Sequence, residues 1–181
     1  MEDGADRKDA ALADRCRRLQ LILTDVDGVL TDGSVVLYPD GTEPKVFHIH
    51  DGMGIVLALR AGLRVGILSG RTSEATTRRA QELGMSPVVQ GVSDKGAALA
   101  TIVEREGLAP DQVAYMGDDV NDLAVMRAVG LSAAPADAPM DVRLEAVMVT
   151  EKAGGRGCFR ELIEAILRAR GDWDRLVASG T

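Results

Sequence analysis

The 181-residue sequence predicts an α/β fold in which a Rossmann-like parallel sheet carries helices on both faces. From residue 63 onward, short apolar runs alternate with longer segments of helical character, and this alternation is typical of a parallel sheet. Several apolar runs also end in carboxylate, hydroxyl or ammonium side chains. That placement is typical of open α/β sheets, in which ligands bind beyond the carboxyl ends of the strands.

Each element follows from an apolar or amphipathic run and the residues that bound it. We expect helices over about 9–19, 53–61, 72–83, 94–106, 120–128 and 159–170. We expect strands over about 21–23, 63–68, 88–89, 113–116, 131–133 and 147–149. Asp51 is the expected N-cap of the helix over 53–61, and Gly84 is expected to end the helix over 72–83.

Residues 34–50 lie outside this alternation and predict a small β-hairpin flap. Residues 34–38 and 45–50 alternate between apolar and polar side chains, and Pro39-Asp40-Gly41 supplies a turn between them. The stretches of sequence between successive strands that end in polar residues are too short to include a large cap domain. We therefore expect one domain over 1–181, with residues 1–8 flexible.

Composition restricts the class of protein. A net charge of −7 and a pI near 4.9 argue against a nucleic-acid groove, which needs a basic surface. Cys16 and Cys158 are far apart in the sequence, as in reduced proteins without a disulfide framework. No apolar run approaches the roughly 20 residues of a membrane span, and the polar N-terminus lacks the apolar core of a signal peptide. A cytoplasmic protein without nucleic-acid or membrane partners is expected.

Two carboxylates follow the first apolar strand, and they are the first candidates for chemistry. Asp25 and Asp27 are two residues apart, so in an extended chain both face one pocket. One carboxylate could attack phosphorus while the other moves protons. The simpler alternative is that both only cap the junction between a strand and a loop, since Asp is common in turns.

Three further strand ends carry polar groups. Asp118 could supply oxygen ligands to Mg²⁺, which prefers carboxylate, carbonyl and water. Ser69 could donate a hydrogen bond to a phosphoryl oxygen, and Lys95 could bring positive charge to the same oxygens. Asp119 and Asp122 are expected to orient the ligands of the metal or to cap the following helix. Taken singly, Ser69 would be interpreted as a hydroxyl in a turn, and Lys95 would be interpreted as a solvated charge on the surface.

The order of these groups resembles that of a known family. The motifs of haloacid dehalogenase-like phosphotransferases are matched, in order, by Asp25–Asp27, Ser69–Arg71, Lys95 and Gly117–Asp122. From about residue 10 to 168 the chain also resembles the 3-deoxy-D-manno-octulosonate 8-phosphate phosphatases of that superfamily. This closer resemblance rests on residues 27–33, 51–54, 90–91, 129–132 together with 136–138, and 154–157.

The resemblance implies a role for each principal site residue. Asp25 would be the nucleophile and form an aspartyl-phosphate. Asp27 would protonate the leaving sugar oxygen and then take a proton from the attacking water. Mg²⁺ would lie between the side chains of Asp25 and Asp118 and the backbone carbonyl of Asp27. Ser69 and Lys95 would hold the phosphoryl oxygens. The implied reaction belongs to lipopolysaccharide precursor synthesis.

The resemblance also implies a homotetramer in which the hairpins meet between subunits. An oligomer is expected on separate grounds, because a site without a cap stays wet unless a partner covers it. Gly33, Arg71 and Arg156 are candidate substrate-binding residues, and Arg156 could act in a neighbouring subunit.

Several alternatives remain open. His50 and Met53 stand where enterobacterial members of the family often carry an arginine and an aromatic residue, which leaves the substrate open. A nonulosonate (acylneuraminate-type) 9-phosphate is an alternative substrate, because the phosphatases that act on it have very similar sequences. The fold could also serve as a non-catalytic assembly domain, as a phosphotransferase, or as a module that binds phosphorylated protein. His48 and His50 could bind a transition metal together with Asp51. The alternative is that both histidines belong to one face of the hairpin or to a contact between subunits.

Overall fold

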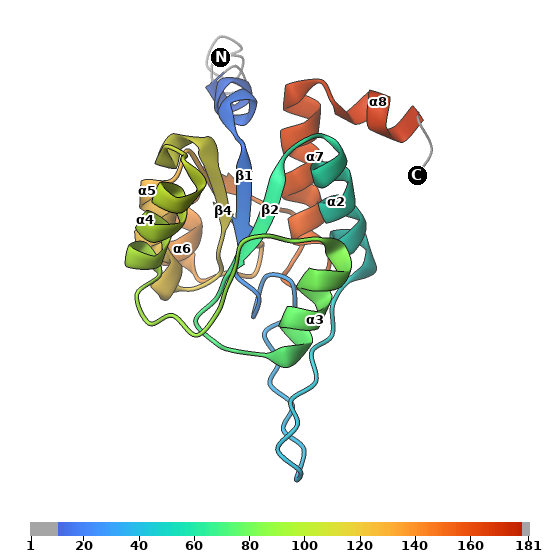
Figure 1. Ribbon diagram of the computed structural model, residues 1–181, viewed down its shortest axis with the longest axis vertical. Helices are drawn as coiled ribbons and strands as arrows, with labels where there is room; N and C mark the ends of the chain where they lie inside the picture. The colour runs from blue at the N-terminus through green and yellow to red at the C-terminus, as the bar shows by residue number, and fades with distance from the viewer. Residues whose placement is uncertain (1–10, 179–181) are drawn as a thin grey trace.

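The computed structural model of the protein describes residues 11–178, and its centre is a six-stranded parallel sheet (Figure 1). The strand order is β3-β2-β1-β4-β5-β6, and every neighbouring pair is parallel. The strands are β1 (Leu21–Thr24), β2 (Arg64–Leu68), β3 (Val88–Val89), β4 (Val113–Met116), β5 (Leu131–Ala134) and β6 (Met148–Val149). The predicted Rossmann-like class is confirmed, and the central position of β1 places its carboxyl end beside those of β2 and β4.

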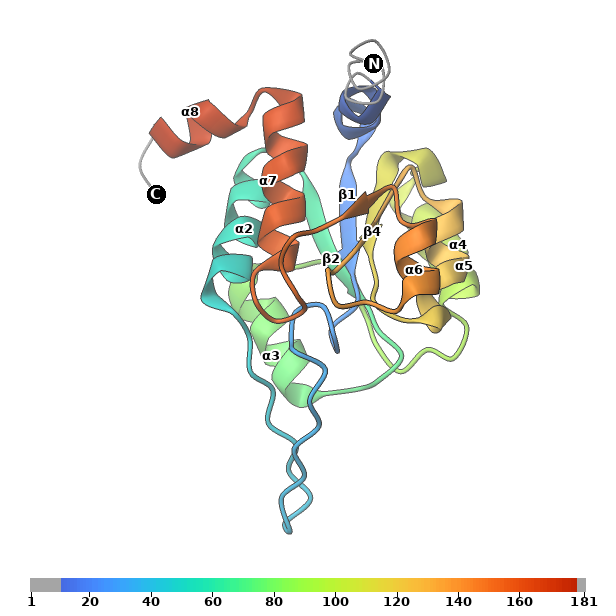
Figure 2. The ribbon, with the colours of Figure 1, turned by 180° about the vertical axis from the view of Figure 1, so that it is seen from behind.

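Helices cover both faces of the sheet (Figures 1 and 2). One face carries α2 (Ile49–Arg60), α3 (Glu74–Leu83) and α7 (Cys158–Arg170), with a helix over 11–18 and α8 (Trp173–Ala178) toward the amino ends of the strands. The other face carries α4 (Lys95–Glu106), α5 (Leu123–Ala128) and α6 (Met140–Glu145). Two short 3-10 turns, η1 (Pro110–Gln112) and η2 (Val120–Asp122), flank β4.

Each face of the sheet has its own apolar core. Phe159 and Ile55 are fully buried between α7, α2 and the sheet. Tyr115 and Leu99 belong to the core on the α4 side. Because both faces are covered, the strands are buried along their length, as expected for a parallel sheet. This double core holds the carboxyl ends of the strands in fixed positions.

Some predicted boundaries are wrong. Helix α2 begins at Ile49 with His48 as its N-cap, so Asp51 lies inside the first turn rather than capping it. The predicted helix over 120–128 is divided into η2 and α5. The short helices α6 and α8 were not expected, because a six-residue helix gives too few turns for an apolar period to be recognised.

We call residues 34–48 the arm. It leaves the body of the molecule as two extended segments that lie side by side (Figures 1 and 2). Hydrogen bonds from the Tyr38 amide to the Thr42 carbonyl (3.0 Å) and from the Gly41 amide to the Tyr38 carbonyl (2.9 Å) close its tip. The predicted strands are nevertheless wrong, because no strand is assigned in residues 34–48. An isolated two-stranded hairpin is marginal in water, and the arm has no third strand to support it.

Two further expectations concern the N-terminal residues and the presence of a membrane span. The expected flexible segment, residues 1–8, lies outside the described residues. Between residues 11 and 178, no helix has both the length and the apolar character needed to cross a membrane.

Candidate active site

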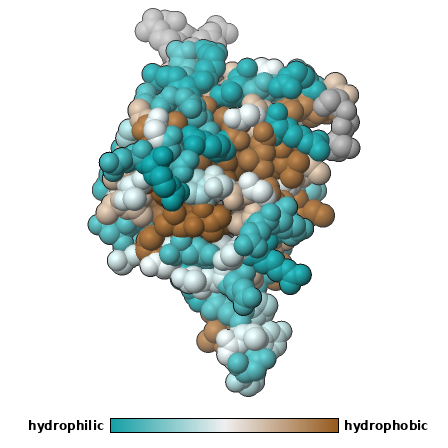
Figure 3. Space-filling model, viewed as in Figure 1, coloured by the Kyte–Doolittle hydropathy of each residue, from teal (hydrophilic) through white to brown (hydrophobic). Residues whose placement is uncertain are grey.

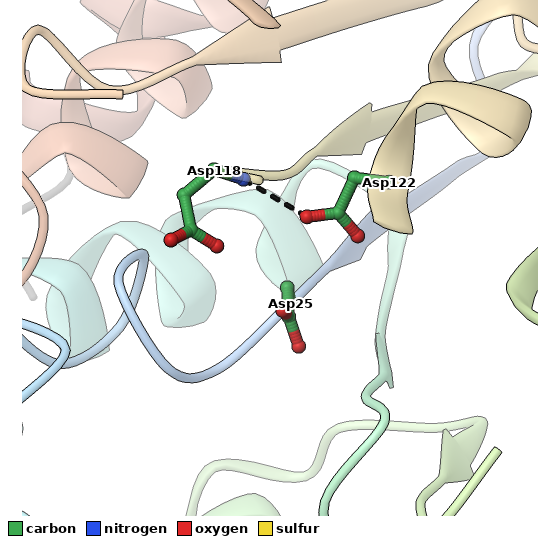
Figure 4. A group of neighbouring side chains, drawn as sticks. All are labelled: Asp25, Asp118 and Asp122. Carbon is green, nitrogen blue, oxygen red and sulfur yellow. Dashed lines mark hydrogen bonds between the residues drawn. The ribbon is translucent and has the colours of Figure 1, made fainter. Parts of the chain in front are cut away.

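Three aspartates converge where β1 and β4 end (Figure 4). Asp25 follows β1 directly, and its amide donates to the Met116 carbonyl at 2.9 Å, so the two strand ends remain in register. Asp118 follows β4, and Asp122 lies one turn further along. One carboxylate oxygen from each of Asp25, Asp118 and Asp122 lies within 4.8 Å of the others. The spacing is close enough for one cation to be shared.

Glycines make this close approach possible. A Cβ atom on Gly28 would lie 2.0 Å from Asp118 Oδ2, and Gly28 has a φ of +81°, which side-chain-bearing residues rarely adopt. A Cβ atom on Gly117 would lie 2.4 Å from the Cβ of Asp122. Any larger residue at these positions would therefore displace a carboxylate of the cluster.

Both oxygens of Asp122 are occupied by hydrogen bonds within the protein. Oδ1 accepts from Lys95 Nζ at 2.6 Å and from the Tyr115 hydroxyl. Oδ2 accepts from the backbone amides of Asp118 (3.0 Å) and Asp119 (3.3 Å) (Figure 4). Asp122 is wholly buried, and these four bonds fix the loop that presents Asp118. This geometry suits an orienting residue better than a direct metal ligand.

Lys95 is the buried cation of the cluster. It is the first residue of α4, which is capped by Asp94, and it is 3% exposed. Its Nζ lies 2.8 Å from Asp25 Oδ2 and 2.6 Å from Asp122 Oδ1. Burial lowers the pKa of Lys95, but the two carboxylates outweigh burial and hold that pKa above its usual value. The ammonium is therefore charged throughout the physiological range.

The three carboxylates of the cluster carry more negative charge than the single ammonium of Lys95 neutralises. The pKa of Asp118 is raised to about 7 by burial and by the neighbouring charges of Asp25 and Asp122. Burial also raises the pKa of Asp25, against the opposing effect of Lys95. Asp25 Oδ1 is buried and has no hydrogen-bond partner among residues 11–178. An unpartnered carboxylate oxygen beside Asp118 fits a hard divalent cation such as Mg²⁺, which takes oxygen ligands.

An open pocket adjoins the cluster and gathers most of the predicted site residues. Its lining includes Asp25, Asp27, Gly33, Ser69, Gly70, Arg71, Asp118, Asp119 and Asn121. Lys95 is in direct contact with Asp25. Arg156 does not line this pocket; its Nη2 lies 3.8 Å from Asp32 Oδ2, and its side chain is exposed. The structure thus brings together nine of the ten predicted site residues. Seven of them line the pocket, and the other two, Lys95 and Asp122, form an ion pair that Lys95 joins to Asp25.

Two residues of the arm reach the site without having been predicted. Lys45 Nζ contacts Asp27 Oδ1, and Glu43 Oε2 accepts from Arg71 Nη2 at 2.6 Å. Lys45 also lies 3.5 Å from Glu43 Oε1, so the four side chains form a continuous set of ion pairs. The alternation of Glu43, Lys45 and Phe47 was a signal that these residues share one side of the arm. It did not indicate which surface that side would meet.

The glycine-rich segment 154–157 supports the loop that carries Asp27. The Gly155 amide donates to the Val29 carbonyl at 2.9 Å, and the Gly154 amide donates to Asp137 Oδ1 at 2.9 Å. A Cβ atom on Gly154 would lie 2.0 Å from the Gly28 carbonyl oxygen. This contact holds the backbone after β1 against the segment that leads into α7.

His48 and His50 do not form a metal site with Asp51. The two rings meet edge to face with centroids 4.9 Å apart, and His48 Nδ1 accepts from the His50 amide at 3.3 Å. The carboxylate of Asp51 is turned instead toward α7, where Oδ1 accepts from the Arg160 amide at 2.7 Å. Across the described part of the chain, the carboxylates close enough together to surround a metal ion are those of Asp25, Asp118 and Asp122, and in this group Asp122 orients Asp118.

The topology and the placement of the carboxylates define a class of protein. The parallel sheet places carboxylates at the ends of two adjacent central strands with a lysine beside them, and these are the residues by which the sequence resembles the haloacid dehalogenase-like hydrolases. Residues 84–162 match that family of hydrolases directly.

Within that class the chain belongs to the 3-deoxy-D-manno-octulosonate 8-phosphate phosphatase family. It is 41% identical over 160 residues to the Escherichia coli K12 phosphatase of that name, covering 88% of this chain and 85% of the relative. It is 39% identical over 157 residues to the Haemophilus influenzae protein, covering 87% of each.

Solved structures agree with this assignment. The Moraxella catarrhalis phosphatase, crystallised with a magnesium ion, a phosphate ion and a KDO molecule, matches with a TM-score of 0.91 and 34% identity, covering 94% of this chain and 98% of that one. The cobalt-bound Haemophilus influenzae phosphatase matches with a TM-score of 0.86 and 37% identity, covering 91% and 99%.

Proposed function

We propose that the protein is a Mg²⁺-dependent phosphomonoesterase that hydrolyses 3-deoxy-D-manno-octulosonate 8-phosphate in lipopolysaccharide precursor synthesis. The observation that carries the proposal is the carboxylate cluster, in which the unpartnered Oδ1 of Asp25 lies in a site shared with Asp118. The relatives that bear this activity in their names cover most of the chain, and one of them holds magnesium, phosphate and KDO.

The proposed reaction has two steps, both centred on Asp25. In the first, a carboxylate oxygen of Asp25 attacks phosphorus, the bond from phosphorus to the sugar oxygen breaks, and Asp27 gives its proton to that leaving oxygen. In the second, Asp27 takes a proton from water, the water oxygen attacks phosphorus, and the bond from phosphorus to the Asp25 oxygen breaks, which releases inorganic phosphate and restores the Asp25 carboxylate. Asp25 and Asp27 both line the pocket, so one substrate position serves both steps.

The other residues would balance charge and hold the substrate. When bound, Mg²⁺ would be held by the side chains of Asp25 and Asp118 and by the backbone carbonyl of Asp27, and it would neutralise charge as the phosphoryl group transfers. Ser69 and Lys95 would hold phosphoryl oxygens through their hydroxyl and ammonium groups. Asp119 and Asp122 would keep Asp118 oriented, as the hydrogen bonds of Asp122 suggest.

Substrate contacts beyond the phosphoryl group form a further part of the proposal. Gly33 and Arg71 line the pocket, and the guanidinium of Arg71 suits the carboxylate of an acidic sugar. Arg156 is exposed and does not line this pocket, so its proposed substrate contact would be made in a neighbouring subunit.

We further propose a cytoplasmic homotetramer assembled through the arm. Apolar side chains on the arm are exposed, including Leu37 (72%), Val46 (80%) and Tyr38 (54%). In Figure 3 hydrophobic residues lie among polar ones on the arm, which projects from the lower end of the molecule. A second copy of the same arm is the occupant best suited to cover them, because antiparallel segments of this kind gain the missing strand partners on pairing. The free buried thiols of Cys16 and Cys158 suit the reducing cytoplasm.

The experiment that tests the proposed function is a measurement of phosphate release from two substrates. Purified protein should release phosphate from 3-deoxy-D-manno-octulosonate 8-phosphate with Mg²⁺, lose this activity in chelator, and act less well on a nonulosonate 9-phosphate. The Asp25→Asn variant should be inactive, whereas Asp14→Asn, at an exposed position on the helix over 11–18, should retain activity. Activity that persists in Asp25→Asn would refute the proposed nucleophile.

A further inference from the structure

The side chain of Lys45, on the arm, is almost completely buried. The side chain is 5% exposed, whereas the adjacent Val46 is 80% exposed. Its ammonium contacts Asp27 Oδ1 and lies 3.5 Å from Glu43 Oε1. A buried ammonium is costly unless carboxylates pair with it, so these contacts fix where the Lys45 side chain can lie.

Glu43 and Arg71 complete the set of contacts around Lys45. Glu43 accepts from Arg71 Nη2 at 2.6 Å, and Arg71 Nε lies 3.9 Å from Asp27 Oδ2. The four side chains therefore form a ring in which each charge has an opposite charge on both sides. Two of its members belong to the arm and two belong to the pocket, so the ring ties the base of the arm to the site.

The side chains of this part of the arm alternate in a way that supports the ring. Glu43, Lys45 and Phe47 are partly or largely buried toward the body, while Pro44 and Val46 are exposed. In an extended chain, residues two apart point the same way. The backbone of the arm therefore directs the side chain of Lys45 toward Asp27.

We propose that Lys45 is a positioning residue that holds the carboxylate of Asp27 in the orientation needed for proton transfer. This inference rests on the proposed function of Asp27 as the proton donor to the leaving oxygen. Glu43 acts one step further away because it pairs with Lys45, and Arg71 in turn pairs with Glu43.

The inference predicts a dependence on the leaving group. The alkoxide of a sugar leaves poorly and needs a proton from Asp27, whereas p-nitrophenolate leaves readily without one. A variant that only misplaces Asp27 should therefore lose much more activity toward the sugar phosphate than toward p-nitrophenyl phosphate. A variant that damages the metal or the phosphoryl site should lose activity toward both equally.

The test compares kcat/KM of the full-length protein for 3-deoxy-D-manno-octulosonate 8-phosphate and for p-nitrophenyl phosphate. Lys45→Met should lower the ratio of the two values by about tenfold or more, since general acid catalysis contributes about 10² to 10⁴. Lys45→Arg should recover part of the ratio, and Glu43→Gln should lower it by a smaller factor. Lys152→Met, which alters an exposed lysine, is the control and should leave the ratio unchanged.

A double variant adds a second readout. In an Asp27→Asn background, Lys45→Met should produce no further loss on the sugar phosphate, because the residue it positions is already disabled. Equal losses on both substrates, or a full additional loss in the Asp27→Asn background, would overturn the positioning role. Should Lys45→Met fail to fold by circular dichroism, Lys45→Arg decides the question: a ratio lowered from that of the unaltered protein supports the positioning role, and an unchanged ratio overturns it.

The outcomes separate this inference from the proposed function. If the unaltered protein hydrolyses the sugar phosphate and Lys45→Met shows no bias between substrates, only the role of Lys45 is rejected. If the unaltered protein fails to hydrolyse the sugar phosphate, the proposed function and the role of Lys45 are both rejected.

Discussion

The α-carbon of Gly28 faces the carboxylate of Asp118 so closely that an added Cβ atom would lie 2.0 Å from Oδ2. The loop after β1 and the loop after β4 are therefore in direct contact at the proposed metal site. A methyl group at position 28 would push Asp118 away from Asp25, and it would also strain a backbone whose φ is +81°.

Gly28→Ala should weaken Mg²⁺ binding by about tenfold or more, because Asp118 is displaced from the position it shares with Asp25. Isothermal titration with Mg²⁺ measures this directly. Gly62→Ala is the matched control: Gly62 has a φ of +82° with no atom within 4 Å of an added Cβ. Both variants should lose about 1–2 kcal/mol of stability from backbone strain, and only Gly28→Ala should lose metal affinity. Equal metal affinity in the two variants would contradict the account.

The raised pKa of Asp118, about 7, predicts how stability depends on pH without metal. In the unfolded chain this carboxyl titrates near its usual value of about 4. Between those values the folded protein binds more protons, so the free energy of unfolding should fall as pH rises from 5 to 8. Urea unfolding in chelator measures this trend.

Two comparisons isolate the contribution of Asp118 to that trend. Asp118→Asn should flatten the pH dependence, because the titrating group is removed. Added Mg²⁺ should oppose the trend, since the cation and protons compete for the same oxygens. A free energy of unfolding that rises with pH in chelator would show that burial and neighbouring charge do not raise this pKa.

Lys95 neutralises two buried carboxylates, so its removal should be severe. Lys95→Met leaves Asp25 and Asp122 without their shared cation, and breaking a buried pair typically costs about 3–5 kcal/mol. The loss should be smaller at pH 5 than at pH 8, because the raised pKa of Asp25 lets that group protonate more readily. Thermal or urea unfolding at the two pH values measures it.

Arg127→Met is the appropriate control for Lys95→Met. Arg127 pairs with Glu145 at 2.9 Å, but both side chains are exposed, and such pairs contribute little. A loss for Lys95→Met no larger than that for Arg127→Met would show that the buried cation does not hold the cluster together.

The arm offers a direct test of the proposed assembly. Leu37 on the arm and Leu144 on α6 are the same residue type and are both 72% exposed. Leu37→Asp should dissociate the oligomer because a charge would be placed in the interface, while Leu144→Asp should leave it intact. Analytical ultracentrifugation distinguishes the two, and circular dichroism should show both variants folded. An unchanged oligomer in Leu37→Asp would exclude the arm from the interface.

The sheet and the clustering of polar residues at its edge were predictable because short apolar runs, and the polar residues that follow them, are local signals. β1 and β4 end within one residue of the predicted positions, which is why Asp25 and Asp118 were found together. The arm was mistaken for a paired hairpin because alternation predicts extended chain and not hydrogen-bond partners. Lys45 was missed because its partner Asp27 is distant in sequence, and only the fold brings an arm of exposed side chains against that carboxylate.

The short elements were unpredictable for a different reason. Asp122 was expected only as a possible support, yet it receives four hydrogen bonds that depend on the 3-10 turn η2 rather than on a regular helix. Turn geometry of this kind is set by the tertiary contacts of the site, which no local period in the sequence records.

Covalent transfer of the phosphoryl group to Asp25 is the central claim, and trapping the intermediate tests it most directly. The protein is mixed with Mg²⁺ and 3-deoxy-D-manno-octulosonate 8-phosphate, quenched in acid within milliseconds, and digested for mass spectrometry. The account predicts one phosphoryl group on the peptide containing Asp25, localised to that residue and missing from Asp25→Asn. Phosphoryl transfer to a different residue, or rapid turnover in Asp25→Asn, would contradict it.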